Sequence, residues 1–236
     1  MSIPQQSVYG DLPLAIEGDF ASANPRASML ASESQLVAGP LGVTVGRFAF
    51  ASLAGLVSNS APGAVSRVGF VHRDQPGMYI TQFLGQSSLL ALAGTPLTLF
   101  DDGDFFCRFA AGVSTLGLKV YASLVTGLAR AGVTGAPTTN ALITADTATN
   151  TTLTVTANTG AALAVGMPVS GAGIPAGTII AALGTGTGGA GTYTLSQATT
   201  ATASGVTVTA TTEIETRWYA DLVCSAGELS KISTRG

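Results

Sequence analysis

Residues that could perform catalysis or bind a metal are few in this chain. The 236 residues include one histidine, His72, and two cysteines, Cys107 and Cys224, which excludes a metal site built from several His or Cys ligands. Arg73 and Asp74 follow the histidine, but no serine stands in the sharp turn that a nucleophile requires. We therefore expect His72 to be a hydrogen-bonded residue at a strand end or part of an interface.

Three carboxylates surround Gly103: they belong to Asp101, Asp102 and Asp104. Carboxylates on one turn are typical ligands of Ca²⁺. Asp-Gly is also the preferred two-residue hairpin turn, and the strand-like runs TLF and FFCRF flank it without further ligands at the spacing of a calcium loop. We favour the hairpin, and a weak surface cation site stays open as the alternative.

The stretch GTGTGG at 184–189 matches a glycine pattern of dinucleotide-binding loops. That pattern binds pyrophosphate only between a strand and the N-terminus of a helix. Here the strand-like TYTLS follows, and no acidic residue stands about twenty positions further on. We interpret the stretch as a turn, and we expect no cofactor, no bound metal and no catalysis in this chain.

Charged residues make up only 10% of the chain, against about 25% in ordinary soluble proteins. The net charge is -3 and the Lys and Arg residues are scattered singly, so we expect no nucleic-acid partner. No apolar run is long enough to span a bilayer and the N-terminus lacks the pattern of a secretory signal, so we expect cytoplasmic synthesis and no membrane partner. Cys107 and Cys224 are then expected to be buried thiols.

Between Arg130 and Glu213 the only charged side chain is Asp146, and Thr, Gly, Ala and Val dominate. Exposed helix faces need Lys, Glu, Arg or Gln, whereas Thr and Val pack well on a pleated sheet. Pieces such as TTLTVTA and GVTVTAT, joined by glycine-rich turns, predict a small immunoglobulin-like sandwich. Because ordinary composition returns after this span, we predict a domain at 134–212 that is inserted into a host.

The host is predicted at 36–133 and 213–236, and it is also all-β. Short apolar runs separated by turn signals are typical of a compact barrel or sandwich. In VTVGRFAFA at 43–51 the apolar residues recur at two-residue spacing, with one slip at Gly46 and Arg47 where we expect a bulge. Trp218 and Tyr219 are expected in the host core.

Residues 1–35 contain several prolines and no sustained period, which predicts an extended N-terminal arm. Asn24 and Pro25 give a fixed bend, and Arg26 has the geometry to pair with a carboxylate on another subunit. An ordinary turn with a solvated arginine is the alternative. We favour the interface, because a polar arm needs a partner to become ordered.

Five stretches of the chain resemble the structural cement, or capsid decoration, proteins of tailed bacteriophages. They are AIEGDFASANPR at 15–26, VGFVHRDQPG at 68–77, GTPLTLFDDGDFFCRF at 94–109, LGLKVYASLVTGLA at 116–129 and AGELSKIS at 226–233. The resemblance implies an all-β protein on the outer capsid surface of the virion, bound where major capsid protein subunits meet, and a homodimer or homotrimer. The inserted segment resembles Thr-rich β-modules of phage head and tail proteins, which usually point outward.

The expected function is therefore that of a cement protein that stabilises the shell against the pressure of packed DNA. A domain and an arm that touch two subunits raise avidity, because the second contact becomes intramolecular. The candidate capsid-interface residues are Phe20, Asn24, Pro25, Arg26, His72 and Arg73. A tail or baseplate component is one alternative, and a host-surface adhesion module that binds glycans through the insert is another.

Overall fold

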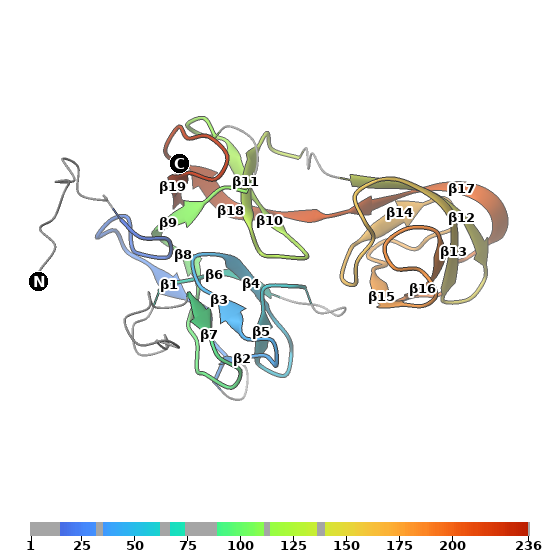
Figure 1. The fold of residues 1–236 in the computed structure, drawn as a ribbon, viewed down its shortest axis with the longest axis horizontal. Helices are drawn as coiled ribbons and strands as arrows, with labels where there is room; N and C mark the ends of the chain where they lie inside the picture. Colours follow the sequence, from blue (N-terminus) through green and yellow to red (C-terminus); the bar gives the residue numbers. More distant parts are fainter. Residues whose placement is uncertain are drawn as a thin grey trace, which may run out of the picture.

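The computed structural model describes residues 15–31, 35–61, 67–73, 89–110, 114–135 and 140–235. Across these residues the chain forms nineteen strands and no helix, which confirms the predicted all-β fold class. The strands form two six-stranded sheets, one five-stranded sheet and one two-stranded sheet (Figure 1). Within the described ranges, no helix has the length and apolar character needed to cross a membrane.

The first six-stranded sheet is built from residues before Gly103 and curls into a small barrel. Its strand order is β1 (Ala27–Ser28), β8 (Leu99–Asp102), β6 (Arg67–Val71), β4 (Phe48–Ala51), β5 (Leu56–Ser58) and β2 (Val37–Ala38). Strand β2 also bridges Pro96, just before β8, so the sheet closes on itself. The separate pair of β3 (Val43–Thr44) and β7 (Leu90–Ala91) contributes Val43 to the core inside this barrel.

The five-stranded sheet combines residues from both sides of the predicted insert. Its strand order is β11 (Ala129–Gly132), β10 (Lys119–Ser123), β18 (Glu213–Ala220), β19 (Leu229–Ser233) and β9 (Asp104–Arg108). Just after β9, Phe109 bridges Ala129 of β11, so this sheet also curls. Its inner face packs against the outer face of the first barrel.

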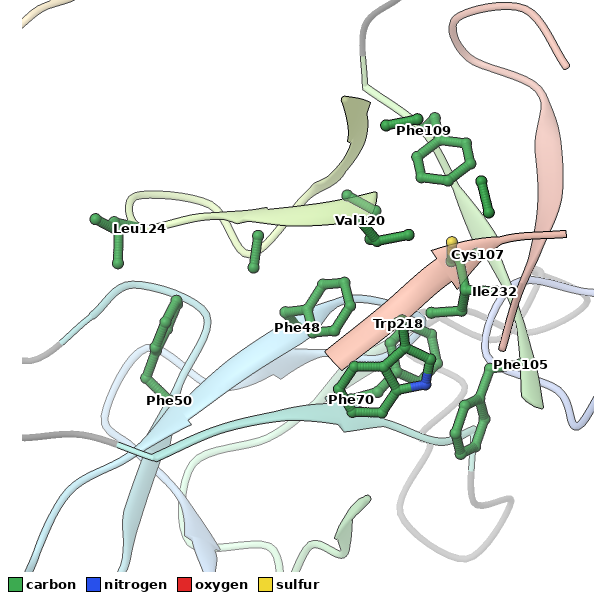
Figure 2. Packing of buried hydrophobic residues seen from close by; sticks show 14 of the residues in the cluster. Phe48, Phe50, Phe70, Phe105, Cys107, Phe109, Val120, Leu124, Trp218 and Ile232 are labelled. Atoms are coloured by element: carbon green, nitrogen blue, oxygen red, sulfur yellow. The ribbon is translucent and has the colours of Figure 1, made fainter. Parts of the chain in front are cut away.

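Strand β4 is buried on both faces, and its alternation divides its side chains between two cores. Ala49 and Ala51 belong to the core inside the first barrel, whereas Phe48 and Phe50 belong to the larger core between the sheets. Figure 2 shows Phe48 beside Trp218 of β18, and their ring centroids lie 5.3 Å apart. Trp218 is therefore a core residue as predicted, and its Nε1 donates to the carbonyl of Gly103 at 3.0 Å.

The prediction for Tyr219 is wrong, because neighbouring residues of a strand point to opposite faces. Tyr219 lies half-buried on the outer face of the sheet, where the Lys119 ammonium is 3.9 Å from its ring centroid. Cys107 and Cys224 are free and buried, as predicted. Burial raises the pKa of the Cys107 thiol well above its usual range.

Two local predictions are also wrong, and in both cases the chain changes sheets. Gly103 does not close a hairpin: β8 belongs to the first barrel and β9 to the five-stranded sheet, so the chain turns a corner at this glycine, which has φ +132°. At Gly46, with φ +75°, the expected bulge is a strand break, since β3 pairs with β7 while β4 pairs with β5 and β6. Both glycines occupy the left-handed region that other residues avoid.

The second six-stranded sheet lies wholly inside the Thr-rich span and has its own core. Its strand order is β14 (Val169–Gly171), β17 (Thr202–Thr211), β12 (Asn140–Ala148), β13 (Thr152–Gly160), β16 (Gly191–Leu195) and β15 (Ile180–Leu183). A bridge between Pro168 and Ile179 joins the two edges, so the strands form one closed sheet. An immunoglobulin-like sandwich has two facing sheets, and that part of the prediction is not confirmed. Register shifts beside Ala145 twist the strands and favour closure.

Candidate functional site

The described part of the arm lies along its own chain. The amide of Gly18 donates to Phe106 O at 2.8 Å and the amide of Ala21 donates to Asp104 O at 2.9 Å, so this segment extends the sheet beyond β9. Further on, β1 pairs with β8. Residues 22–26 therefore pass around the place where the chain changes sheets, and we call residues 18–28 the arm corner.

An aromatic stack fixes the arm corner. The Arg26 guanidinium lies 3.9 Å from the Phe20 ring centroid, and the His72 ring stacks on Phe20 at a centroid distance of 3.9 Å. Two groups this close to one ring must occupy its opposite faces. The edges of Phe20 contact Phe100 and Phe105, at centroid distances of 5.6 and 5.4 Å. Cation and ring contacts of this kind are worth about 0.5–1 kcal/mol each at exposed sites.

His72 directly follows β6, and its Nδ1 donates to the carbonyl of Gly18 at 2.7 Å. This confirms the prediction of a hydrogen-bonded histidine at a strand end. Its neighbour Arg73 also binds the arm: the Arg73 amide donates to Gly18 O at 3.0 Å, and its guanidinium lies 3.4 Å from the Asp19 carboxylate. The end of β6 therefore holds residues 18–20 in place.

Asp104 fastens the other side of the arm corner. One of its carboxylate oxygens accepts from Ser22 Oγ and from Asn24 Nδ2, each at 2.5 Å, and the other accepts from Ser233 Oγ at 2.7 Å. Burial raises the pKa of Asp104, but the hydrogen bonds from Ser22, Ser233 and Asn24 outweigh burial and hold the pKa below its usual 3.8. The ionised carboxylate thus joins the arm, β9 and β19.

The structure gathers all the predicted interface residues at this corner. Pro25 takes part through its carbonyl, which accepts from Arg235 Nη2 at 3.0 Å. Asn24, Pro25 and Arg26 are exposed, while Phe20, His72 and Arg73 are half-buried. The expectation that the arm needs another subunit to become ordered does not apply to residues 18–28. Contact of these residues with a capsid subunit stays a prediction.

The other chemical candidates have structural partners. Asp101 lies 3.5 Å from Arg217, and Asp102 accepts a hydrogen bond from Thr234, which holds the pKa of Asp102 below its usual range. Among the described residues no group of three His, Cys, Asp or Glu could hold a metal ion. The stretch at 184–189 is a turn before β16, as predicted, and Tyr193 Oη donates to Gly189 O at 2.7 Å.

Sequence reasoning missed three leucines that point into solvent. Leu30, Leu41 and Leu53 are 82%, 86% and 79% exposed. For two of them the sequence carries a signal: Leu41 stands in the turn Gly-Pro-Leu-Gly at 39–42 and Leu53 in Ser-Leu-Ala-Gly at 52–55. An apolar residue between turn-forming residues projects outward, and exposed apolar side chains are candidates for contact with a partner.

Comparison with known proteins identifies the kind of protein that carries this corner. A family model described as XM1 gp53 minor capsid protein matches residues 5–163. No curated protein matches the chain. The matched range includes the arm corner, the whole first barrel and the first two strands of the Thr-rich sheet. It supports a structural role in the virion of a phage. Because the match covers more than half of the chain, the protein belongs to the XM1 gp53 minor capsid protein family.

Proposed function

We propose that this chain is a cement protein that binds the outer face of the phage capsid where major capsid protein subunits meet. One observation carries the proposal. The arm corner of this capsid-family protein is exposed at residues 24–26, yet the chain's own contacts already fix its backbone. A surface that is fixed before binding loses little conformational entropy when it meets its partner.

Arg26 supplies the specific contact in this proposal. Its guanidinium stacks on Phe20, and within the described residues it makes no salt bridge. The edge of a stacked guanidinium keeps its N–H groups directed outward, where a carboxylate on a capsid subunit would accept two of them. Leu41, on the turn before β3, offers an apolar contact to a second subunit. Two such contacts on one rigid body give the avidity that a cement needs.

The chemistry of the arm corner supports a mechanical role over an enzymatic one. Its buried carboxylate, Asp104, is held ionised by three donors, and its histidine donates to a backbone carbonyl. A general acid or base needs a proton that it can exchange with a substrate, and these groups are committed to holding the arm. A homodimer or homotrimer on the shell, with the Thr-rich sheet directed outward, completes the proposal. Membership of a capsid protein family favours a place on the capsid over one in the tail.

A binding experiment with phage shells prepared without this chain tests the proposal. Wild-type protein should bind the shells and raise the temperature at which they release DNA. Arg26→Glu should bind about tenfold more weakly, since it places like charges at the contact. Arg67→Glu is the matched control, because Arg67 is an exposed arginine at the start of β6, the end opposite His72. Failure of the wild-type protein to bind shells would refute the cement function.

A further inference from the structure

An arginine with an unsatisfied nitrogen lies next to the arm corner. Arg47 stands between the strand break at Gly46 and the start of β4, and it is half-buried. Its Nε is buried and has no hydrogen-bond partner, and within the described residues its side chain makes no salt bridge. Buried donors are almost always satisfied in folded proteins. An orphaned guanidinium nitrogen therefore indicates that the described residues do not complete the site.

Among the described residues, the acids near Arg47 form their salt bridges with other arginines. Arg108 Nε lies 3.5 Å from the Glu17 carboxylate, and Arg73 Nη1 lies 3.4 Å from the Asp19 carboxylate. Each nearby acid thus already has its own arginine. Burial raises the pKa of Glu17, and the positive charges of Arg108 and Arg47 offset that effect only in part. Glu17 is therefore attracted to both arginines, but its salt bridge is with Arg108.

Arg73 shares the same defect and the same place. Its Nε is also buried without a hydrogen-bond partner. The backbone brings the two arginines together, because the amide of Gly46 donates to Val71 O at 2.9 Å and the amide of Val71 donates to Arg47 O at 3.0 Å. A Cβ built on Gly18 would lie 3.0 Å from Arg73 Cβ and 3.1 Å from the amide nitrogen of Gly46. The backbone segments that carry Arg47 and Arg73 thus lie side by side, next to Gly18 of the arm.

We propose that Arg47, with Arg73 beside it, receives a carboxylate from a neighbouring capsid subunit. An ionised carboxylate is planar and accepts two parallel N–H bonds from a guanidinium, so it would bind the end of the Arg47 side chain and balance its charge. A nucleic-acid backbone fits less well, since it needs several cations in a row and the basic residues of this chain are scattered singly. This inference rests on the proposed cement function and identifies the partner's group.

Replacing Arg47 by methionine separates a docking role from a structural one. Methionine keeps an unbranched stem and removes the charge. A partly buried cation without a salt bridge is desolvated at a cost to the free protein, so Arg47→Met should unfold at the same or a higher urea concentration than the wild type. A structural arginine would give the opposite result. Loss of stability in Arg47→Met would overturn the proposal.

Shell binding provides the second readout. Arg47→Met should bind shells lacking this chain about tenfold more weakly than wild type at low salt, and the difference should shrink at about 0.5 M salt. The shell affinity of Arg47→Lys should lie between those of the wild type and Arg47→Met, because lysine keeps the charge but lacks the planar guanidinium. Arg67→Met, which removes an exposed arginine that donates to Leu30 O, should match the wild type.

The outcomes distinguish this inference from the function on which it rests. If the wild type binds shells and Arg47→Met binds them equally well, the carboxylate site is refuted and the cement function stands. If the wild type does not bind shells, both fall. If Arg47→Met keeps shell binding but no longer self-associates in sedimentation, the partner group belongs to a second copy of this chain. If it keeps shell binding but loses affinity for duplex DNA, the partner group belongs to nucleic acid. Either result would overturn the assignment to the capsid.

Discussion

Removing the carboxylate of Glu213 should destabilise the host where it meets the Thr-rich span. Arg130 of β11 and Glu213 of β18 form a two-pronged ion pair: Nε lies 2.8 Å from Oε1, and Nη2 lies 2.7 Å from Oε2. Their side chains are only 10% and 9% exposed, and Arg130 also donates to Ala131 O at 2.8 Å. Strands β11 and β18 flank β10, so this pair lies where the two ends of the Thr-rich span meet the five-stranded sheet.

The expected magnitude follows from this burial. Breaking a buried ion pair by deleting one partner costs about 3–5 kcal/mol, because the remaining charge is left uncompensated. With about a tenth of each side chain exposed, Glu213→Ala should lower the free energy of unfolding by about 3 kcal/mol. Replacing Arg130 with Met and Glu213 with Leu together should restore most of the lost stability, to within about 1 kcal/mol of the wild type.

Urea unfolding followed by Trp218 fluorescence measures this change in the host, since Trp218 is the only tryptophan and lies in the host core. Arg67→Ala, which removes an exposed arginine, is the control and should change stability by less than about 0.5 kcal/mol. A loss below about 1 kcal/mol for Glu213→Ala would show that water screens the pair and would refute the reasoning from burial.

Three further predictions concern the insert, the stack and the arm. Excising residues 136–211 and joining the ends with four flexible residues should leave a host that unfolds cooperatively, since β11 and β18 lie two strands, or about 10 Å, apart. Loss of the Trp218 transition would show that the host needs the Thr-rich span in order to fold. Phe20→Ala should lower the free energy of unfolding by about 2 kcal/mol, roughly half of the cost at a fully buried Phe, because the ring is half-buried. An unchanged urea midpoint would contradict a stabilising role of the aromatic stack. For Asp104, whose pKa is lowered by folding, the stabilisation is present above the usual pKa of 3.8 and is lost as the pH falls through the folded value. Asp104→Asn should therefore be less stable near neutral pH and lose less stability than the wild type in acid; parallel pH profiles would refute this.

Local patterns in the sequence predicted the β-structure and several of the buried side chains. The alternation of Phe and Ala in β4 needed no tertiary information, because a period of two places the larger residues on one face. The scarcity of charge between Arg130 and Glu213, where Asp146 is the only charged residue, likewise predicted β-structure. Trp218 could be assigned to the core from its size alone. In these cases each residue's own chemistry decides the outcome.

The sheet to which each strand belongs was not predictable from the same patterns. Gly103 follows an aspartate, as in many hairpin turns, but the signal describes only the bend, not the strand that pairs next. The chain turns the corner because Phe100 and Phe105, on either side of it, both pack against Phe20, which arrives from a distant part of the sequence. Arg47 shows the same limit. Its place beside a slip in the alternation predicted an irregularity, but not that its side chain would lack a partner.

The geometry of the arm corner also determines how it would carry mechanical load. A capsid subunit that pulls on residues 24–26 pulls on a segment that is paired with β9 on one side and with β8 on the other. Backbone hydrogen bonds of antiparallel strands run perpendicular to the strands, so a pull along the arm shears several of them together instead of opening them one at a time. Asp104 adds a cross-link from the arm to β19 through Ser233. Load applied at the exposed bend is thus shared between two sheets, which is the property that a protein holding shell subunits together requires.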